Sequence, residues 1–312
     1  MIMRDHVVLD SRGFWYACKA LAMLLLMISA TRYGIALAAE RLADDAHHAA
    51  TAPAAAAVAT PEPPETLPLR EVPIPEVDAE AYVVADVSTG RVFASRNADT
   101  DLPIASISKL MTALVASDAI PTDSLITISA ADRAQTEGTP GRLPSGTTYR
   151  AGDLLFPLLM ESNNSVGFAL ARTHSRFVEK MNERAATLGM TATFVEPTGL
   201  SAQNRASARD LFTLLRYLYD EHPELLAITR TASHPIATAK GRQYDVPNFN
   251  VFVGDSAFQG GKTGYTDDAN QTMAALFSIN GRTIAIIVLG TPDRKADIAA
   301  LREWVTRSLP DR

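Results

Sequence analysis

Strand-forming and helix-forming segments are segregated along this chain, and their order limits the folds it can adopt. Residues 81–95 predict a β-hairpin, because the β-rich run AYVVADV is followed by Ser-Thr-Gly and by RVFAS. A second hairpin is predicted over 272–290, where TMAALFSI and RTIAIIVLG flank an Asn-Gly pair suited to a type I′ turn. Apolar residues recur at helical spacing over 152–162, 164–174, 175–190, 207–228 and about 295–308. This order predicts an α+β domain, with an antiparallel sheet flanked by helices and a helical lobe.

The first 38 residues are expected to be an export signal and not part of the fold. Positive charges at Arg12 and Lys19 precede the apolar run ALAMLLLMISA, residues 20–30. Ala36-Leu37-Ala38 then offers small residues at the spacing that a signal peptidase accepts. An uncleaved membrane anchor is the alternative, but the apolar run is shorter than the roughly 20 residues that a spanning helix needs. Membrane association is expected only in that case.

A linker and one large domain follow the signal. The stretch TAPAAAAVATPEPPETLPL is rich in Ala and Pro and contains no aromatic residue. Such a composition cannot bury a core and favours an extended, partly polyproline conformation. We therefore expect a signal peptide at 1–38, an Ala/Pro-rich linker at 39–76 and the folded domain at 77–312.

Composition argues against several classes of function. The formal net charge is −6, so the chain lacks the basic face that nucleic-acid binding requires. The single cysteine, Cys18, lies in the predicted signal, so neither a thiol nucleophile nor a disulfide is expected in the domain. The histidines of the domain, His174, His222 and His234, stand apart in the sequence, and neither a metal nor another cofactor is predicted.

A serine and a lysine open the helix predicted over residues 105–119, which is otherwise strongly apolar. Ser106 and Lys109 are three residues apart, which places both side chains on one helical face within contact distance. A lysine in the first turn of a buried helix is partly desolvated, and desolvation favours the neutral amine that can accept the serine proton. Taken alone, a capping serine with an exposed lysine is the simpler interpretation.

A second polar group, Ser162-Asn163-Asn164, interrupts two apolar helical segments. A hydroxyl and an amide at such a position are expected to be buried and to need hydrogen-bond partners. The pattern Ser-x-Asn is weak by itself, because it also begins at Ser95 and Ser278 in the two predicted hairpins. Its place between two helices distinguishes the Ser162 copy.

The third group is GGKTGYT, residues 260–266, which precedes the second hairpin. Its glycines permit close approach of the backbone, and a strand edge with Lys262 and Thr263 can hold a peptide carboxylate. A glycine-rich turn with a solvated lysine is the alternative for this group alone.

Together, the three groups have the order and context found in penicillin-binding proteins and class A β-lactamases. Longer stretches carry the same resemblance, among them GRLPSGTTYRAGDLLFPLLMESNN, FVEKMNERAATLGM and FVEPTGLSAQNRASARDL. They are similar to the low-molecular-mass D-alanyl-D-alanine peptidases, most of all to endopeptidases of the penicillin-binding protein 7 type. The resemblance spans about residues 80–292 and implies the fold of the serine β-lactamases and D,D-peptidases.

The resemblance also implies a serine enzyme that acts on peptidoglycan stem peptides through an acyl-enzyme. Ser106 would attack the D-alanyl carbonyl, and Lys109 would take its proton. Ser162 would relay that proton to the leaving amine, while Asn164 holds the substrate amide.

Substrate binding is expected at the third group. The resemblance assigns the terminal carboxylate to Lys262 and Thr263, and it places the oxyanion hole at the backbone N–H groups of Ser106 and Tyr265. The predicted substrate-binding set is Lys262, Thr263, Gly264 and Tyr265.

Three alternatives to an endopeptidase stay open. A carboxypeptidase would trim terminal D-alanine, although the short segment after the second hairpin leaves no room for the extra β-domain that many carboxypeptidases carry. A β-lactamase would need a deacylating carboxylate such as Glu196, although Leu200 stands where that family has asparagine. An inactive cell-wall binding module would keep the fold without turnover. The endopeptidase hypothesis places the protein in the periplasm, with β-lactam antibiotics as covalent inhibitors.

Overall fold

The computed structural model describes residues 69–137, 139 and 141–310. The predicted export signal and most of the predicted linker lie outside these residues. The strands are β1 (Ala81–Asp86), β2 (Val92–Arg96), β3 (Leu102–Pro103), β4 (Leu125–Ile128), β5 (Thr147–Arg150), β6 (Arg205–Ala206), β7 (Ser233–Ala237), β8 (Gln243–Pro247), β9 (Phe258–Thr266), β10 (Asn270–Ile279) and β11 (Arg282–Thr291). The helices are the 3-10 helix η1 (Ala105–Ile107), α2 (Ser108–Ala119), α3 (Ala130–Ala134), α4 (Ala151–Leu159), α5 (Asn164–Ala171), α6 (Phe177–Thr187), α7 (Ala208–Glu221), α8 (Pro223–Arg230) and α9 (Arg294–Ser308). None of the helices in the described ranges has the length and apolar character of a membrane span.

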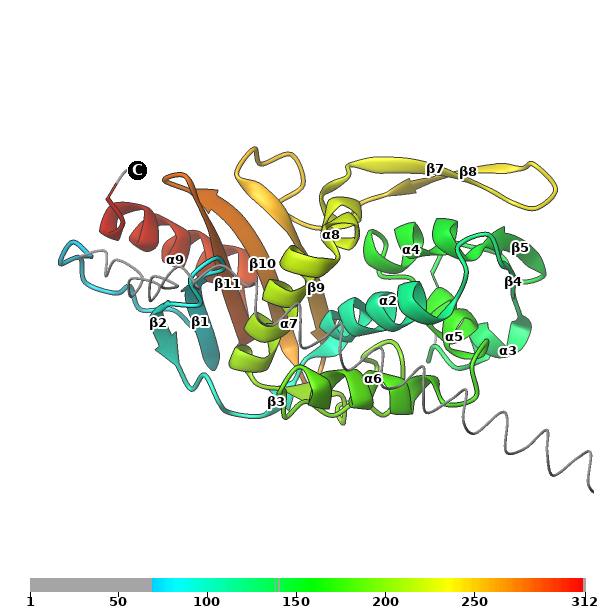
Figure 1. Cartoon of the computed structure of the whole chain (residues 1–312), viewed down its shortest axis with the longest axis horizontal. Coiled ribbons are helices and arrows are strands. Elements are labelled where there is room, and N and C mark those ends of the chain that lie inside the picture. Colours follow the sequence, from blue (N-terminus) through cyan, green and yellow to red (C-terminus); the bar gives the residue numbers. More distant parts are fainter. Residues whose placement is uncertain (1–68, 138, 140, 311–312) are drawn as a thin grey trace, which may run out of the picture. The chain divides into compact units, whose positions relative to one another are not determined.

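Five antiparallel strands form the main sheet, in the order β2-β1-β11-β10-β9 (Figure 1). Both predicted hairpins belong to it, as β1–β2 and β10–β11. Asn280 and Gly281, between β10 and β11, have φ of 49° and 73°, which is the positive pair that a type I′ turn requires. β9 lies at the edge of this sheet and pairs only with β10 among the described strands.

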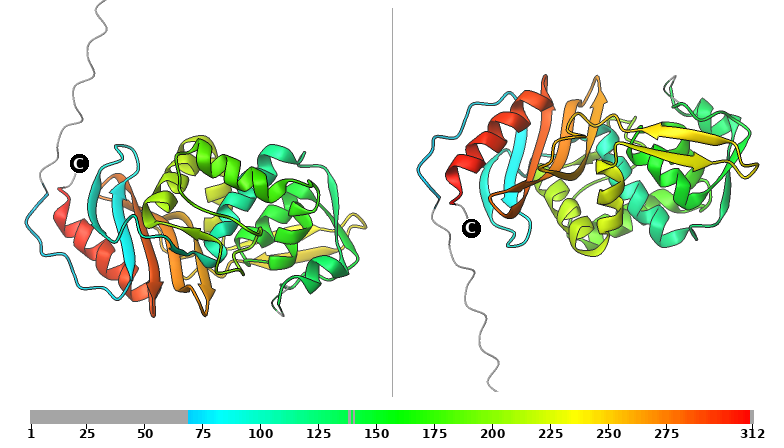
Figure 2. Two further views of the ribbon diagram at one scale, coloured as in Figure 1. Left: turned by 90° about the horizontal axis from the view of Figure 1, so that it is seen from below. Right: turned by 90° about the horizontal axis from the view of Figure 1, so that it is seen from above.

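Alternation along the strands divides the core into two layers. In β1, Val83 and Ala85 point into the layer shared with α7, whereas Tyr82 and Val84 point into the layer under α9. α9 therefore covers one face of the sheet and α7 the other (Figure 2). The sheet is buried on both faces, which explains why its inner strands are apolar along most of their length.

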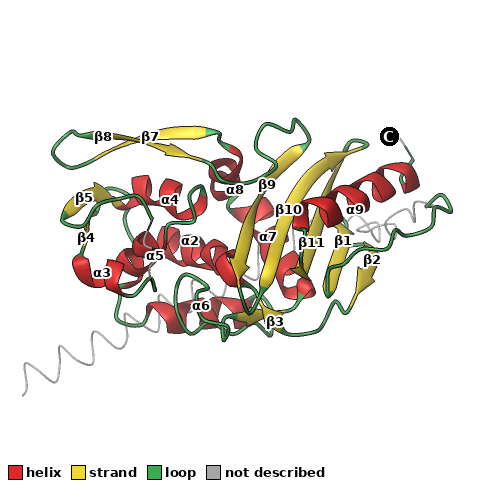
Figure 3. Ribbon diagram, turned by 180° about the vertical axis from the view of Figure 1, so that it is seen from behind, coloured by secondary structure: helices red, strands yellow, loops and turns green. Residues whose placement is uncertain are grey.

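A helical lobe packs beside the sheet, with α2 at its centre (Figure 3). Every residue from 108 to 116 is buried, and α4, α5 and α6 all pack against α2. The predicted fold class, an antiparallel sheet flanked by helices with a helical lobe, is therefore confirmed.

The secondary structure differs from the prediction in three places. The helix expected over 207–228 is two helices, because Pro223 lacks an N–H and opens α8 at its first position. The helix expected from residue 105 begins as the 3-10 turn η1. The long hairpin β7–β8 is not predicted, because its residues alternate only weakly between apolar and polar.

The end of the predicted linker is part of the domain. The backbone N–H of Arg70 donates to the carbonyl of Ser308 at 2.9 Å, and Trp304 Nε1 donates to the carbonyl of Val72 at 3.0 Å. Leu69 and Val72 also pack against the core under α9. Residues 69–72, which the prediction assigns to the linker, therefore pack against the domain, because their apolar side chains contact the core under α9.

Candidate active site

The Ser106 hydroxyl and the Lys109 amine are in contact, with Nζ 2.8 Å from Oγ. The serine lies in η1 and the lysine in the first turn of α2, and the backbone before them is strained, because Ala105 has φ of 48°. The Ala105 carbonyl accepts a hydrogen bond from Ser108 Oγ at 2.9 Å. A side chain on Gly199 would collide with this carbonyl at 1.8 Å, so only glycine fits there. The loop of Gly199 and the start of α2 thus hold the strained turn.

Lys109 is fully buried and is not the solvated lysine of the simpler interpretation. Its amine contacts Ser106 and donates to the carbonyl of Thr198 at 2.7 Å. Burial lowers the pKa of Lys109 to about 7, and the nearby Glu196 carboxylate opposes this shift. A substantial fraction of the amine is therefore neutral near neutral pH and can accept a proton.

Ser162 and Asn164 stand where α4 ends and α5 begins. Ser162 has φ of 60°, and its buried Oγ has no hydrogen-bond partner within the part of the chain that the structure describes. Asn164 Nδ2 donates to the Thr139 carbonyl at 2.8 Å, while its Oδ1 is buried and, among described residues, also lacks a partner. Asn163 has a structural role, because its side chain caps α5 by accepting from the N–H of Val166. Ser162 and Asn164 are left with polar atoms that an incoming ligand can satisfy.

The Lys-Thr-Gly group lies on the edge strand β9, as the sequence analysis predicts. Gly260 and Gly261 have φ of 130° and 150°, and a Cβ on Gly261 would lie 2.3 Å from the carbonyl oxygen of Ala274 on β10. Lys262 is buried, and its Nζ donates to the Thr263 carbonyl at 2.8 Å. The pKa of Lys262 lies well below its usual range, first because of burial and then because of the positive charges of Lys109 and Arg294.

The three groups meet in one cleft of about 790 Å³ between the edge strand and the helical lobe. Six of the eight predicted site residues line it, and they are Ser106, Ser162, Asn164, Thr263, Gly264 and Tyr265. The other two, Lys109 and Lys262, are buried behind this lining. The structure thus brings together residues that are up to about 160 positions apart in the sequence.

Gly264 lies close to the backbone of Ser106, the predicted nucleophile, and this leads to a testable prediction. A methyl group at residue 264 would lie 2.5 Å from Thr272 Oγ1 and 2.9 Å from both the Ser106 nitrogen and the Ile104 carbonyl oxygen. In Gly264→Ala, β9 must move away from Ser106, so we expect acylation by penicillin to slow by about 100-fold, the loss typical of a misplacement of about 1 Å. Stopped-flow fluorescence with a fluorescent penicillin measures this rate.

Gly152→Ala is the matched control, because a methyl group at the start of α4 meets nothing closer than 3.3 Å. It should acylate at the wild-type rate. A Gly264→Ala variant that is folded and acylates as fast as the wild type would contradict the tight contact between β9 and Ser106.

Several residues of the cleft are not among the predicted site residues, because they belong to none of the three motifs. Arg294 belongs to the first turn of α9, and its guanidinium donates to the carbonyl of Gly264 and, at 3.3 Å, to that of Thr272. Glu161 directly precedes Ser162, and Thr139 comes from the loop after α3. Only the sheet order, which places the start of α9 beside β9, brings Arg294 to the cleft.

Glu196, considered as a deacylating base, is engaged elsewhere. Its carboxylate accepts hydrogen bonds from the N–H groups of Thr198 at 2.7 Å and Gly199 at 2.5 Å, and from the Thr198 hydroxyl at 2.6 Å. Among the residues described, it is not part of the cleft lining. Glu196 therefore stabilises the loop that presents the Thr198 carbonyl to Lys109.

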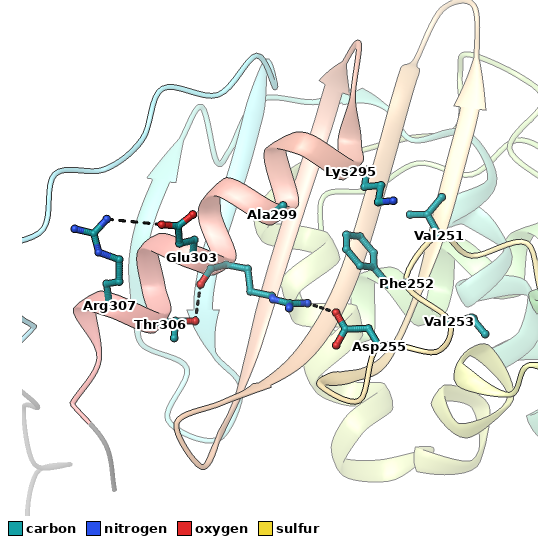
Figure 4. A pocket seen from close by; sticks show the side chains of 10 residues that line it. Val251, Phe252, Val253, Asp255, Lys295, Ala299, Glu303, Thr306 and Arg307 are labelled. Carbon is teal, nitrogen blue, oxygen red and sulfur yellow. Dashed lines mark hydrogen bonds and ion pairs between the residues drawn. The ribbon is translucent and has the colours of Figure 1, made fainter.

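A second pocket, of about 480 Å³, lies between α9 and the segment 251–255 (Figure 4). Arg302 on α9 forms an ion pair with Asp255 there. Its described lining includes no predicted site residue, so the candidate site is the cleft at Ser106. The described residues also contain no cluster of three or more His, Cys, Asp or Glu that could hold a metal ion.

The fold and the grouped motifs are those of the penicillin-binding proteins. The D-alanyl-D-alanine carboxypeptidase of Mycobacterium tuberculosis H37Rv has a similar structure, with a TM-score of 0.70 and 30% identity over 77% of this chain and 95% of that one. Penicillin-binding protein D2 of Listeria monocytogenes, solved in its cefotaxime-bound form, gives a TM-score of 0.63 and 28% identity over 75% of this chain and 99% of that one.

The chain belongs to the D-alanyl-D-alanine carboxypeptidase family, peptidase family S11, which it matches over residues 69–293. A D-alanyl-D-alanine endopeptidase of Pseudomonas aeruginosa is 34% identical over 81% of this chain and 84% of its own length. The D-alanyl-D-alanine endopeptidase of Escherichia coli is 33% identical over 74% of this chain and 78% of its own length. The resemblance to the D-alanyl-D-alanine peptidases is thereby confirmed.

Proposed function

We propose that this member of the family is a serine endopeptidase that cleaves the D-alanyl cross-link between two peptidoglycan stem peptides. The observation that carries the proposal is the 2.8 Å contact between Ser106 Oγ and the amine of the fully buried Lys109. A hydroxyl is a weak nucleophile, and a neutral amine at hydrogen-bond distance is the base it needs.

Acylation begins when the neutral Lys109 amine accepts the Ser106 proton. Oγ attacks the D-alanyl carbonyl carbon, and the backbone N–H groups of Ser106 and Tyr265 bind the oxyanion that forms. Ser162, whose Oγ is otherwise unpartnered among the described residues, passes the proton to the leaving amine as the amide C–N bond breaks. The products of this half are an ester on Ser106 and a free amine.

The substrate is held at both sides of the scissile bond. Lys262, Thr263 and Arg294 form the cationic and hydroxyl-bearing end of the cleft that binds the carboxylate next to the leaving amine. Asn164 binds the amide of the acyl side. Water then attacks the ester, with Lys109 as the base that contacts Ser106 Oγ, and hydrolysis restores the serine.

Support for an endopeptidase over a carboxypeptidase comes from the relatives. The endopeptidases of P. aeruginosa and E. coli match over 84% and 78% of their own length, whereas the carboxypeptidase DacC of E. coli matches over 58%. The carboxypeptidase DacB2 of M. tuberculosis also matches over 85% of its own length, at 32% identity.

Digestion of purified sacculi tests the proposal. We expect cross-linked muropeptide dimers to fall to monomers with the wild-type protein and to persist with Ser106→Ala, as measured by chromatography of the released muropeptides. If dimers persist with the wild type while pentapeptides become tetrapeptides, the protein is a carboxypeptidase and the endopeptidase proposal is wrong.

A β-lactamase or an inactive binding module fits less well. Glu196, the carboxylate that a β-lactamase would need, is occupied by its own loop. A protein that only binds the cell wall does not need a buried lysine amine in contact with a serine hydroxyl. This chain keeps Ser106, Lys109 and Lys262.

Export to the periplasm follows from the proposed substrate, which lies outside the cytoplasmic membrane. We propose that residues 1–38 are a cleaved signal and that the protein associates with the membrane only if this segment is retained. β-Lactam antibiotics, which bind the Listeria protein named above, are expected to acylate Ser106 of this chain.

A further inference from the structure

The cleft contains basic and acidic groups. Its basic groups are Arg294 in the lining and the buried Lys262 on the Lys-Thr-Gly strand. Its lining also contains four carboxylates, which are Glu137, Glu161, Asp267 and Asp268. A substrate bound in this cleft therefore has carboxylates as well as basic groups within its lining.

Glu161 differs from the other carboxylates of the cleft, because it is buried. Its side chain is 3% exposed, whereas Asp267 is a surface residue that accepts a hydrogen bond from the Tyr265 hydroxyl. Burial of a carboxylate without full compensation is expensive, so natural proteins rarely leave one unpaired. The position of Glu161, directly before Ser162, brings this group next to the predicted chemistry.

The protein compensates Glu161 only in part. Oε1 lies 3.3 Å from Arg142 NH1, but the Arg142 side chain is 60% exposed and its charge is screened by solvent. Oε2 has no hydrogen-bond partner of good geometry among the residues that the structure describes, and the amide of Asn163 is its neighbouring donor group. Burial raises the pKa of Glu161, while the charge of Arg142 and then the weak side-chain hydrogen bond of Asn163 lower it. Oε2 can therefore accept a stronger hydrogen bond from a ligand.

We infer that Glu161 is a specificity-determining residue whose free oxygen accepts a hydrogen bond from a primary ammonium on the substrate peptide, close to the scissile bond. This inference rests on the proposed function and names the chemical class of peptide that the same cleft selects. An ammonium supplies both the donor and the opposite charge that a buried carboxylate lacks. An acylated amine has lost its charge and adds bulk, so it is discriminated against.

Matched substrates test this preference. Muropeptide dimers with free amines are compared with the same dimers after treatment with acetic anhydride, which converts the amines into neutral amides. We expect the wild-type kcat/KM to fall by about 10- to 100-fold on acetylation, the range of a hydrogen bond to a charged group. Glu161→Gln, which has the same size, should cleave both dimers at similar rates. Because this variant removes a buried charge, its thermal stability should be unchanged or higher.

Arg142→Gln separates recognition from a structural role. It removes the ion-pair partner of Glu161 but leaves the carboxylate, so the preference for the free amine should remain. If Arg142→Gln loses the preference as fully as Glu161→Gln, the pair only supports the loop, and the inference is overturned. Equal wild-type rates on both dimers would also overturn it.

Monomeric pentapeptides, free and acetylated, distinguish this inference from the proposed function. If the wild type leaves dimers intact but trims pentapeptides, the endopeptidase proposal fails, and the ammonium preference is read from the pentapeptide pair. If the dimers are cleaved without regard to acetylation, the function stands and the role of Glu161 is wrong.

Discussion

Ser106→Ala is expected to abolish covalent labelling by a fluorescent penicillin, as measured on denaturing gels, and to remove all cleavage of muropeptide dimers. The Ser106 hydroxyl is the group in contact with the Lys109 amine, so alanine leaves the base without a nucleophile. The fold should persist, because Ser106 is only half-buried and alanine removes a single oxygen. Mass spectrometry of the wild-type adduct should locate the penicilloyl group on the peptide that contains Ser106.

Ser162→Ala is the control for this experiment. It removes a hydroxyl from the same cleft but leaves the Ser106–Lys109 pair, so the variant should still become labelled, at a lower rate. Persistent labelling of Ser106→Ala would show that another residue is acylated and would overturn the mechanism. Rapid nitrocefin turnover that depends on Glu196 would instead favour a β-lactamase.

The fold class was predictable because alternation and helical spacing are local properties of the sequence. The β10–β11 hairpin is the clearest case, since Asn280-Gly281 dictates the turn and the alternating strands dictate the faces. The split of the helix expected over 207–228 was also encoded locally, in Pro223. The packing of residues 69–76 was not predictable from the local sequence. Leu69 packs against the core under α9, and α9 is far from Leu69 in the sequence.

The candidate site was predictable only where a motif marks it. The three-residue spacing of Ser106 and Lys109 predicts that their side chains are in contact, as they are. The place of Ser162 and Asn164 between two helices predicts buried polar atoms, and both residues have them. The meeting of these groups depends on long-range packing, such as the 3.1 Å hydrogen bond from Thr272 Oγ1 to the Ile104 carbonyl. Arg294 and Glu161 lack any such mark, and their importance follows from burial and charge, which the sequence alone does not supply.

Lys109→Arg is expected to reduce the rate of acylation by about 10²- to 10⁴-fold, the usual contribution of a general base. Arginine keeps the positive charge but cannot lose its proton at any pH at which the protein is folded. Because Lys109 is fully buried, the larger guanidinium of arginine strains the packing around it. Lys109→Met is therefore made as a second variant, since methionine is apolar and about as long as lysine. Both variants should show this loss of rate, whereas Lys240→Arg, which changes an exposed lysine in the β7–β8 turn, should acylate at the wild-type rate.

The pH dependence of the acylation rate is an independent test of Lys109 as the base. Burial lowers the pKa of Lys109 to about 7, while the nearby Glu196 carboxylate raises it, and the neutral amine is the proposed active form. The wild-type acylation rate should therefore rise with pH through about 7 and level off above it, with the buried Lys262 contributing to the observed midpoint. Residual acylation in Lys109→Met should lack this acid limb.

The stability of the fold should follow the same titration with a defined sign. In the unfolded chain Lys109 has a pKa of about 10.4, so between roughly pH 7 and 10 the unfolded state binds more protons than the folded state. The free energy of unfolding of the wild type should increase with pH across this window more than that of Lys109→Met, in urea titrations at several pH values. Lys109 is not the base if the Lys109→Met variant acylates at the wild-type rate. It is also not the base if the wild-type acylation rate stays constant when the pH is lowered to values under 7. Either result would leave Ser106 as a possible nucleophile.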